Sequence, residues 1–344
     1  MTDGTTQYGS LTEGVSLDYK VAISLQDKQH LTGTITAVTM KPDTKSIVET
    51  QTLGSALIDS GQDQLAEGGI KNAVQAAYRD GRYRYTPFAI MGGESMRYQT
   101  GSYIDSKGWN IGLGLSRVVN NAEGRLTFGP VISYGHSSYD SYLDDGLHAD
   151  GSAHYTGIGF LLRQDDKDGF YYEGSFGGGQ LKSDYNSSDL ATSYDDSANY
   201  YAFHAGVGKV QKLSGSASLD YYGKYFYSHQ CASSATLATG ENYHFDSIDS
   251  NRLRIGARVE NAYSDRASLY YGAAWEYEFG GDARVTYKGY NAPSPSLKGG
   301  SGLAEVGWKV RPYKDSPFSA DLSLTGWAGK KEGFSLGVML DWEI

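Results

Sequence analysis

The segment Leu53–Ala77, LGSALIDSGQDQLAEGGIKNAVQAA, is the one long stretch of this chain that reads as a helix. Its glycines weaken that helix, because each costs on the order of 1 kcal/mol relative to alanine in a helix interior. The segment would not be stable alone in water, so we expect a narrow and partly polar channel to enclose it. Its apolar residues at helical spacing are Leu53, Leu57, Leu65, Ile70, Ala73, Val74 and Ala77.

The composition favours a large barrel over two ordinary domains. The 344 residues include 45 Gly and 29 Tyr but only 7 Pro. Mean hydropathy is −0.47, and no apolar run is long enough for a transmembrane helix. A barrel in an outer membrane keeps a polar average, because lipid-facing and lumen-facing residues alternate. The net charge of −10 argues against nucleic acid as a partner.

Residues 1–51 are polar and rich in β-forming residues, and they are too few for a sizeable core. We expect two strands there, Val15–Leu25 and Leu31–Met40, at the end of an upstream domain. The start MTDGTTQYGS has neither a basic nor an apolar stretch, so an exported protein would make this an internal fragment of a longer precursor. The single cysteine, Cys231, excludes an internal disulfide.

After the helix, which we expect to end in a turn over Arg79, Asp80, Gly81 and Arg82, the chain alternates apolar and polar residues between turns. We expect about twelve strands of about eleven to fifteen residues, the length of a tilted membrane crossing. The expected strands are Arg84–Tyr98, Ser106–Val119, Arg125–Tyr139, Gly151–Arg163, Gly169–Lys182, Ala198–Val210, Ser216–His229, Asp249–Asn261, Ala267–Gly280, Gly300–Val310, Pro317–Ala328 and Gly333–Glu343.

Alternation gives each strand an aliphatic face and a face of glycine, small polar and charged residues. A soluble sandwich would place the charges outside, so we expect the charged face to line a lumen. The charged lumen residues are then Glu173, Asp220, Lys224, Arg252, Arg254, Arg258, Glu276, Glu278, Glu305, Lys309, Asp321 and Asp341. The helix positions expected in the pore are Leu57, Leu65, Ile70, Asn72 and Val74.

Connection lengths alternate around the predicted barrel. Short turns are expected at Asn120–Gly124, Asp165–Asp168, Gln211–Gly215, Ala262–Arg266 and Arg311–Ser316. Longer loops are expected at Tyr139–Asp150, Ser183–Ser197, Gln230–Ile248 and Gly281–Gly299. Short turns mark the periplasmic rim of outer-membrane barrels, so the first strand runs outward. The helix then meets that strand at the periplasmic rim, and residues 1–51 lie either in the periplasm or, through the pore, outside.

The order of these features resembles the translocator β-domain of autotransporters, the type V secretion proteins of Gram-negative bacteria. A helix precedes about twelve strands, with the Gly-spaced segments GWNIGLGLSRVV and GFYYEGSFGGG and the closing GFSLGVMLDWEI. The family usually ends in an aromatic residue, whereas here Trp342 stands two residues before Ile344.

The resemblance implies an all-β fold, a twelve-stranded antiparallel transmembrane barrel with an N-terminal helix in its pore. Residues 1–51 would be the remnant of a passenger or linker, 52–81 the pore helix and 82–344 the outer-membrane barrel. The implied partners are outer-membrane lipids, the protein's own passenger at the cell surface, the barrel assembly machinery and periplasmic chaperones.

Export without catalysis is the preferred function, with no catalytic residue, cofactor or metal site expected. A diffusion porin is the alternative, and a barrel hydrolase using loop histidines such as His148, His229 or His244 is a third. Glu276 and Glu278 share a face and could do acid–base chemistry, but an ion network bracing the lumen is the better interpretation. Self-cleavage at Asn72 is disfavoured, since Lys71 rather than a second Asn precedes it.

Overall fold

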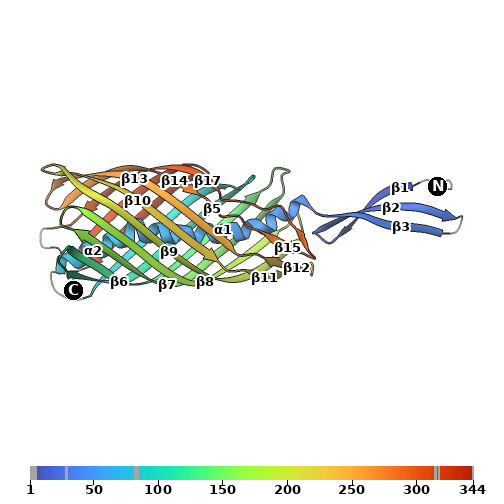
Figure 1. Ribbon diagram of the computed structural model, residues 1–344, viewed down its shortest axis with the longest axis horizontal. Coiled ribbons are helices and arrows are strands. Elements are labelled where there is room, and N and C mark those ends of the chain that lie inside the picture. Colours follow the sequence, from blue (N-terminus) through green and yellow to red (C-terminus); the bar gives the residue numbers. More distant parts are fainter. Residues whose placement is uncertain (1–5, 28–29, 81–84, 314–315, 317, 343–344) are drawn as a thin grey trace.

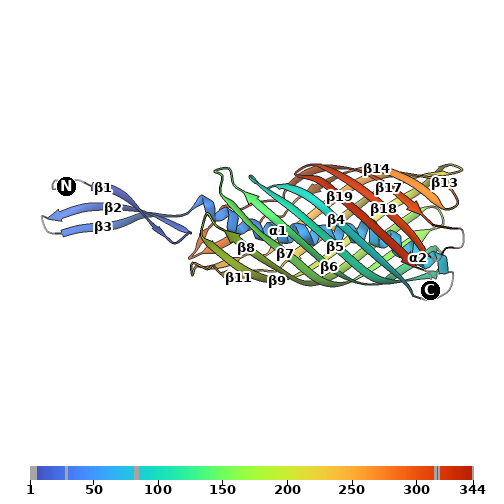
Figure 2. The same ribbon diagram turned by 180° about the vertical axis from the view of Figure 1, so that it is seen from behind.

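The computed structural model describes residues 6–27, 30–80, 85–313, 316 and 318–342. They form a closed antiparallel barrel of twelve strands with a helix in its lumen, and a small sheet projects from one end (Figures 1 and 2). The barrel therefore matches the expected fold class. Several predictions fall outside the described residues: the turn residues Gly81 and Arg82, the strand ends Arg84, Pro317 and Glu343, and Ile344.

The barrel strands follow one another around the wall in sequence order. The first and last of them, β4 and β19, pair from Phe88 with Asp341 to Tyr98 with Lys331, which closes the barrel. The strands are β4 Thr86–Gln99, β5 Tyr103–Asn120, β6 Gly124–Tyr142, β7 His148–Asp166, β8 Phe170–Ser187, β9 Thr192–Ser214, β10 Ala217–Gln230, β13 Ile248–Ser264, β14 Ala267–Glu278, β17 Gly299–Val310, β18 Phe318–Gly329 and β19 Lys331–Trp342.

Two of the predicted long loops are wrong. Tyr139–Asp150 and Ser183–Ser197 are mostly strand, because β6 to β9 continue as paired arms beyond the neighbouring strands. Some of their Asp residues, such as Asp140 and Asp195, face outward, whereas Ser141 and Asp196 face inward and bond to the rod. Inward tyrosines stack, as Tyr185 and Tyr194 do with ring centroids 5.2 Å apart. Ser and Asp are common in loops, but they are also compatible with strand pairing where they face solvent or bond to a partner.

The other two long connections, Gln230–Ile248 and Gly281–Gly299, carry a small sheet at the same rim. Its strands are β11 Ser233–Thr236, β12 Asn242–Phe245, β15 Val285–Tyr287 and β16 Tyr290–Asn291. Beyond it projects a three-stranded sheet of β1 Thr6–Glu13, β2 Leu17–Asp27 and β3 His30–Met40 (Figure 1). The second and third of these strands were expected, and β1 was not.

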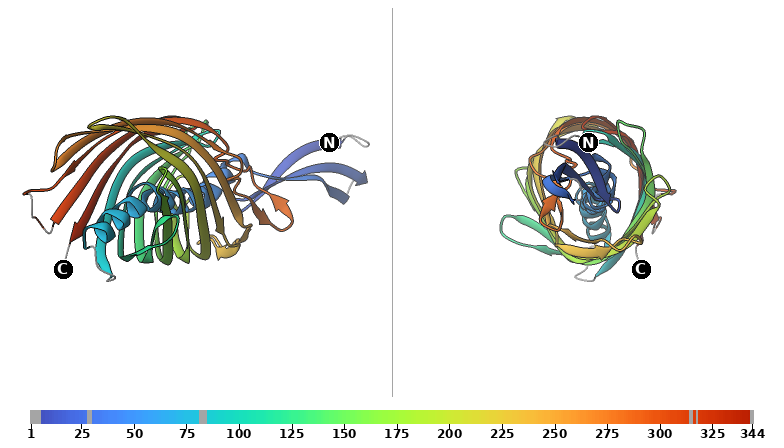
Figure 3. Two further views of the ribbon diagram at one scale, coloured as in Figure 1. Left: turned by 60° about the vertical axis from the view of Figure 1, so that its left-hand side comes forward. Right: turned by 90° about the vertical axis from the view of Figure 1, so that its right-hand side faces the viewer.

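One helical rod runs through the lumen from the rim that carries β11 and β12 to the opposite rim (Figure 3). It consists of a 3₁₀ turn η1 Pro42–Thr44, α1 Lys45–Gln64, a π-helical turn η2 Leu65–Gly69, and α2 Ile70–Asp80. The predicted start at Leu53 is wrong, since α1 begins at Lys45. Most residues in the first two turns of α1 are polar. Glu49 among them accepts hydrogen bonds from Thr100 at 2.7 Å and Ser102 at 2.6 Å, in the turn between β4 and β5.

Glycines let the rod approach the wall closely. A β-carbon on Gly54 would lie 2.6 Å from a methyl of Leu181, and one on Gly61 would lie 2.2 Å from the hydroxyl of Tyr155. α1 packs mainly against β5 to β8, and α2 against β4 and β5. The glycines that weaken the isolated helix therefore allow it to fit its enclosure.

The outer face of the barrel is aliphatic and aromatic, as the alternation predicts. Ile132, Ile158 and Ile255 are 58%, 72% and 57% exposed, whereas the inward Arg252 is 3% exposed. Among the described residues, none of the helices combines the length and the apolarity that a membrane crossing demands.

Gly61→Ala should loosen the rod, although alanine raises helix propensity by about 1 kcal/mol. The new methyl group would collide with Tyr155, which is buried and donates a hydrogen bond to Asn110 at 3.0 Å. Limited proteolysis of α1 in the folded barrel should become faster. The matched control is Gly68→Ala, where the nearest atom is the flexible Met339 sulfur at 3.1 Å, and proteolysis should not become faster. Equal effects of the two substitutions would contradict this account.

Candidate functional site

Three acidic residues of the rod lie on one face of α1 and η2. Asp59, Asp63 and Glu67 recur every fourth residue, which stacks them along a helix. The facing strand β13 points Arg252, Arg254 and Arg258 into the lumen, because residues an even number apart share one face of a strand. We call these six residues the charge ladder.

The ladder is continuous along the rod from Asp59 to Glu67. Arg252 lies 3.5 Å from Asp59 and 2.7 Å from Asp63. Arg254 lies 2.8 Å from Asp63 and 3.3 Å from Glu67, and Arg258 lies 3.5 Å from Glu67. Each acid thus contacts one or two arginines, and the contacts follow the residue order of the rod and of β13.

Wall residues complete the charge balance. Glu276 on β14 accepts hydrogen bonds from Arg254, and Glu305 on β17 accepts two from Arg258. Two lysines reach the rod from other strands: Lys224 on β10 lies 3.2 Å from Glu67, and Lys331 on β19 lies 3.4 Å from Asp63. Removing one member of such a buried pair typically costs about 3–5 kcal/mol, because the other charge stays buried without a partner.

A cavity of about 160 Å³ lies beside the rod, lined by the ladder and by residues of β4, β14, β17, β18 and β19. It exists because the rod packs against β4 to β8, which leaves space before the opposite wall. The arginine side chains cross this space to reach the acids. Long, charged side chains can therefore hold a helix that does not fill its pore.

The remaining predicted lumen residues are inward, but most form pairs within the wall. Asp220 accepts from Tyr171 at 2.9 Å, and Asp321 accepts from Tyr270 at 2.8 Å. Glu278 shares Ser250 with Asp59 of the rod. Further wall pairs join Glu173 to Lys224 and Arg163, Lys309 to Glu260, and Asp341 to Ser319.

The predicted positions of the rod have different surroundings. Leu57 and Ile70 are buried in apolar clusters with the wall, Leu65 packs against the cluster that contains Ile70, and Val74 is half-buried. Asn72 is 2% exposed and donates its amide hydrogens to the wall.

The acids of the rod and Lys331 are functional candidates that the sequence analysis missed. The signal was present, since Asp59, Asp63 and Glu67 have the four-residue spacing of one helix face. The helix was predicted from its apolar residues, which lie on another face than these acids. Lys331 could not have been found in this way, because it stands at the first position of β19 beside a turn.

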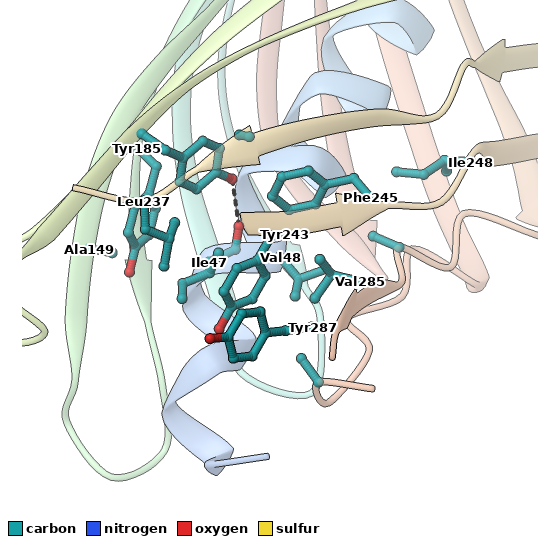
Figure 4. Close-up of a cluster of buried hydrophobic side chains, with 14 of the residues drawn as sticks. Ile47, Val48, Ala149, Tyr185, Leu237, Tyr243, Phe245, Ile248, Val285 and Tyr287 are labelled. Atoms are coloured by element: carbon teal, nitrogen blue, oxygen red, sulfur yellow. Dashed lines mark hydrogen bonds between the residues drawn. The ribbon is translucent and has the colours of Figure 1, made fainter. Parts of the chain in front are cut away.

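An apolar cluster lies at the rim of the barrel that carries β11 and β12 (Figure 4). It joins Ile47 and Val48 of α1 to Tyr243 and Phe245 of β12, and Leu17 of β2 is buried with them. The turn between β1 and β2 docks beside it, where Glu241 accepts the Val15 amide at 2.9 Å and Ser16 lies 2.6 Å from the Tyr243 hydroxyl. The rod and the projecting sheet are therefore anchored to the same rim.

The histidines considered for hydrolysis lie apart on the rim. His148 contacts Asp140 at 3.1 Å and His229 contacts Asp249 at 2.8 Å, whereas His244 lies 3.0 Å from Ser234. His244 is an exposed residue on the small sheet. Within the described parts of the chain, no three His, Cys, Asp or Glu side chains are grouped so as to hold a metal ion.

Acid should release the turn between β1 and β2. Burial acts to raise the pKa of Glu241, but hydrogen bonds from Thr239, the Val15 amide and Ser16 outweigh it and lower that pKa. A lowered pKa stabilises the folded form above the ordinary value of about 4.3, and that stability is lost as pH falls through the folded value. Glu13 behaves alike, its pKa lowered by hydrogen bonds from Lys288 and Tyr19.

The measurement is the hydrogen-exchange protection of the Val15 amide, corrected for the intrinsic rate at each pH. Protection should fall below about pH 4 in the unaltered protein. Glu241→Gln should lower protection at pH 7 and reduce its pH dependence, and Glu13→Gln/Glu241→Gln should remove the dependence. Unchanged pH dependence in the double variant would contradict this assignment.

Comparisons with known proteins give one family. The family model described as Autotransporter beta-domain matches residues 88–323. No curated protein sequence matches the chain. Among solved structures, the transport unit of AIDA-I from Escherichia coli has a TM-score of 0.64 at 12% identity, covering 88% of this chain and 99% of that one.

Two further translocators have the same fold. The β-domain of BrkA from Bordetella has a TM-score of 0.61 at 13% identity, covering 76% of this chain and 99% of that one. The translocator domain of NalP from Neisseria meningitidis has a TM-score of 0.59 at 14% identity, covering 83% and 98%. With the family model matching more than half of the residues, the chain belongs to the autotransporter β-domain family, outer-membrane barrels of Gram-negative bacteria that export a passenger.

Proposed function

We propose that this barrel passes its upstream segment outward through the lumen and then retains the rod as a plug. The observation that carries the proposal is the path of the rod, which enters at the rim with β11 and β12 and leaves at the rim with short turns (Figure 3). Chain upstream of Lys45 therefore lies on the far side of the barrel from the start of β4. Passage through the pore accounts for that separation.

The rim with β11, β12 and the long arms of β6 to β9 faces the outside in this proposal, since short turns mark the periplasmic side. β1, β2 and β3 then form the junction between barrel and passenger at the cell surface. The barrel assembly machinery and periplasmic chaperones would supply the steps before the barrel closes.

Export of this kind requires no catalytic group in the barrel. The closed sheet pairs its backbone groups, the aliphatic exterior suits lipid, and the polar lumen suits a chain in transit. We infer that the domain is not an enzyme. The exposed pair of Ser234 and His244 is one place where a hydrolase could act. Any hydrolysis of esters or peptides by the refolded protein should be the same before and after Ser234→Ala, and a loss of hydrolysis in that variant would contradict this inference.

The charge ladder has a positional role in this proposal. Acids four residues apart meet arginines on one strand in one alignment, so sliding the rod by one turn leaves buried charges without partners at both ends. The ladder would therefore stop the rod at one axial position. Neutralising one charged residue would weaken the ladder without moving the rod, whereas moving the acids along the rod would change its axial position.

Conductance separates a plugged export barrel from a porin. The full chain in a planar bilayer should be mostly closed, because the rod occupies the lumen. A chain beginning at residue 81 should conduct steadily, and Asp63→Asn/Glu67→Gln should open intermittently. A porin would conduct equally with and without residues 1–80, and that result would exclude the plug.

Export itself is tested with a reporter domain fused upstream of Thr6 in cells. External protease should degrade the reporter when the barrel is intact. The matched control is the same fusion with β19 deleted, which cannot close the barrel. Protection of the reporter in cells with a correctly inserted barrel would contradict outward passage.

Moving the acids by one turn tests the ladder. Asp59→Asn with Lys71→Glu places acids at 63, 67 and 71 and should shift the rod outward by about 6 Å. In a Cys231→Ser background, Gly54→Cys should cross-link to Leu181→Cys in the parent, because a Gly54 β-carbon meets Leu181. In the shifted variant Ile58→Cys should form that link instead. An unchanged link from position 54 would show that other contacts set the position.

A further inference from the structure

Two carboxamides of the rod contact the wall in the same unusual way. Asn72 donates its Nδ2 hydrogens to the carbonyl oxygens of Ala89 at 3.0 Å and Leu340 at 2.9 Å. These two residues stand directly opposite each other on β4 and β19. One side chain thus bonds to both strands of a pair.

Gln62 repeats the arrangement elsewhere in the wall. Its Nε2 donates to Phe203 of β9 at 3.2 Å and Tyr227 of β10 at 2.8 Å, which are also directly opposite each other. Of the two pairs, only β9 and β10 are also joined by a short turn. Gln62 therefore serves as an internal reference for the contact that Asn72 makes.

The pair β4 and β19 is the seam of the barrel, where the first strand meets the last. Every other pair of neighbouring barrel strands is joined by a connection in the chain, and this pair is not. Hydrogen bonds and packing alone hold the seam. Its central part faces the cavity, and Gly92 and Gly337 stand opposite each other there, so side chains add little behind it.

The local structure of the rod aims Asn72 at the seam. The π-helical turn Leu65–Gly69, in which the Ile70 amide bonds to the Leu65 carbonyl, changes the helical phase between Glu67 and Asn72. Glycines at 68 and 69 let Met339 of β19 and Ile90 of β4 approach the rod, at 3.1 and 3.2 Å from their β-carbon positions. The rod therefore touches both seam strands within one turn of Asn72.

We propose that Asn72 is a positioning residue that clamps the seam once the rod is seated. Both amide hydrogens find acceptors only when β4 and β19 are paired and the rod is at its full depth. The clamp thereby couples the seating of the rod to the closure of the barrel. This role is separate from plugging and does not depend on the direction of export.

Asparagine suits the clamp because it carries two donors on one nitrogen. Aspartate at this position would place carboxylate oxygens against carbonyl oxygens, and alanine would leave two carbonyls without a donor from the rod. The buried position also excludes water as a ready substitute, since Asn72 is 2% exposed.

Hydrogen exchange of the full chain in detergent tests the clamp. Asn72→Ala should speed exchange in residues 86–96 and 331–342 about thirtyfold, since two hydrogen bonds of roughly 1 kcal/mol each are lost. Residues 198–210 and 217–230 should exchange as before. Gln62→Ala is the matched control and should affect the second set of peptides while leaving the seam unchanged.

Two further variants keep the test decisive. Asn72→Ser retains one donor, should raise seam exchange less than alanine does, and supplies the measurement if Asn72→Ala does not fold. A disulfide between Met91→Cys and Val338→Cys, opposite each other across the seam, should suppress the effect of Asn72→Ala in a Cys231→Ser background. Unchanged seam exchange in both Asn72 variants, or an equal rise throughout the barrel, would overturn the proposal.

Discussion

The rest of the structure depends on the pairing of buried charges between the rod and β13. Charges removed from water are costly, and that cost is recovered only with good geometry and additional hydrogen bonds. Arg252 and Arg254 are 3% and 2% exposed, and each contacts acids on both the rod and the wall. The acids of the rod find most of their basic partners on the wall, so the rod could not bury them alone. Arg252 and Arg254 share Glu276 on the wall and bond to the acids of the rod as well.

The same pairing accounts for a helix that is weak by itself. A segment with Gly61, Gly68 and Gly69 and three acids on one face has little reason to fold in water. Such a segment can enter a pore extended and become helical where wall groups accept its polar side chains. The glycines then serve fit, because a β-carbon at 61 would meet Tyr155. The same glycines therefore lower the helix propensity of the segment and allow it to fit closely inside the barrel.

Much of the fold could be predicted because period-two alternation is a local signal. The strand faces in β13 and β14 follow from residue order alone, and the structure places Arg252, Arg254, Glu276 and Glu278 inward accordingly. The start of the rod could not be found, because Glu49 and its neighbours are helical only through partners far away in sequence, such as Thr100. The polar arms of β6 to β9 were missed for a related reason, since each arm pairs with the strand segment across a turn and its Ser and Asp residues are equally common in loops.

The site was harder to predict than the fold because it exists only between elements. The arginines were assigned to the lumen, but their acids are on the rod, and no strand pattern indicates which helix face meets β13. Asn72 shows the same limit. It was expected in the pore and weighed for self-cleavage, whereas its partners are carbonyl groups of two strands more than two hundred and fifty residues apart in sequence. Every residue has a backbone carbonyl group, so the sequence does not show which of these groups accept the hydrogen bonds of Asn72.

The rod is held at three depths, and these contacts cannot be optimised independently. Ile47 and Val48 lie in the apolar cluster at the rim with β11 and β12, the ladder follows along the rod, and Asn72 contacts the seam nearer the opposite rim. Because one continuous helix carries all three, a displacement of one turn would bury side chains wrongly at the mouth, unpair charges and remove the amide from both strands. The losses add along the rod, so one position is selected far more sharply than any single contact could achieve. Because one rigid rod runs through the closed barrel, a displacement of the rod changes its contacts at both rims together.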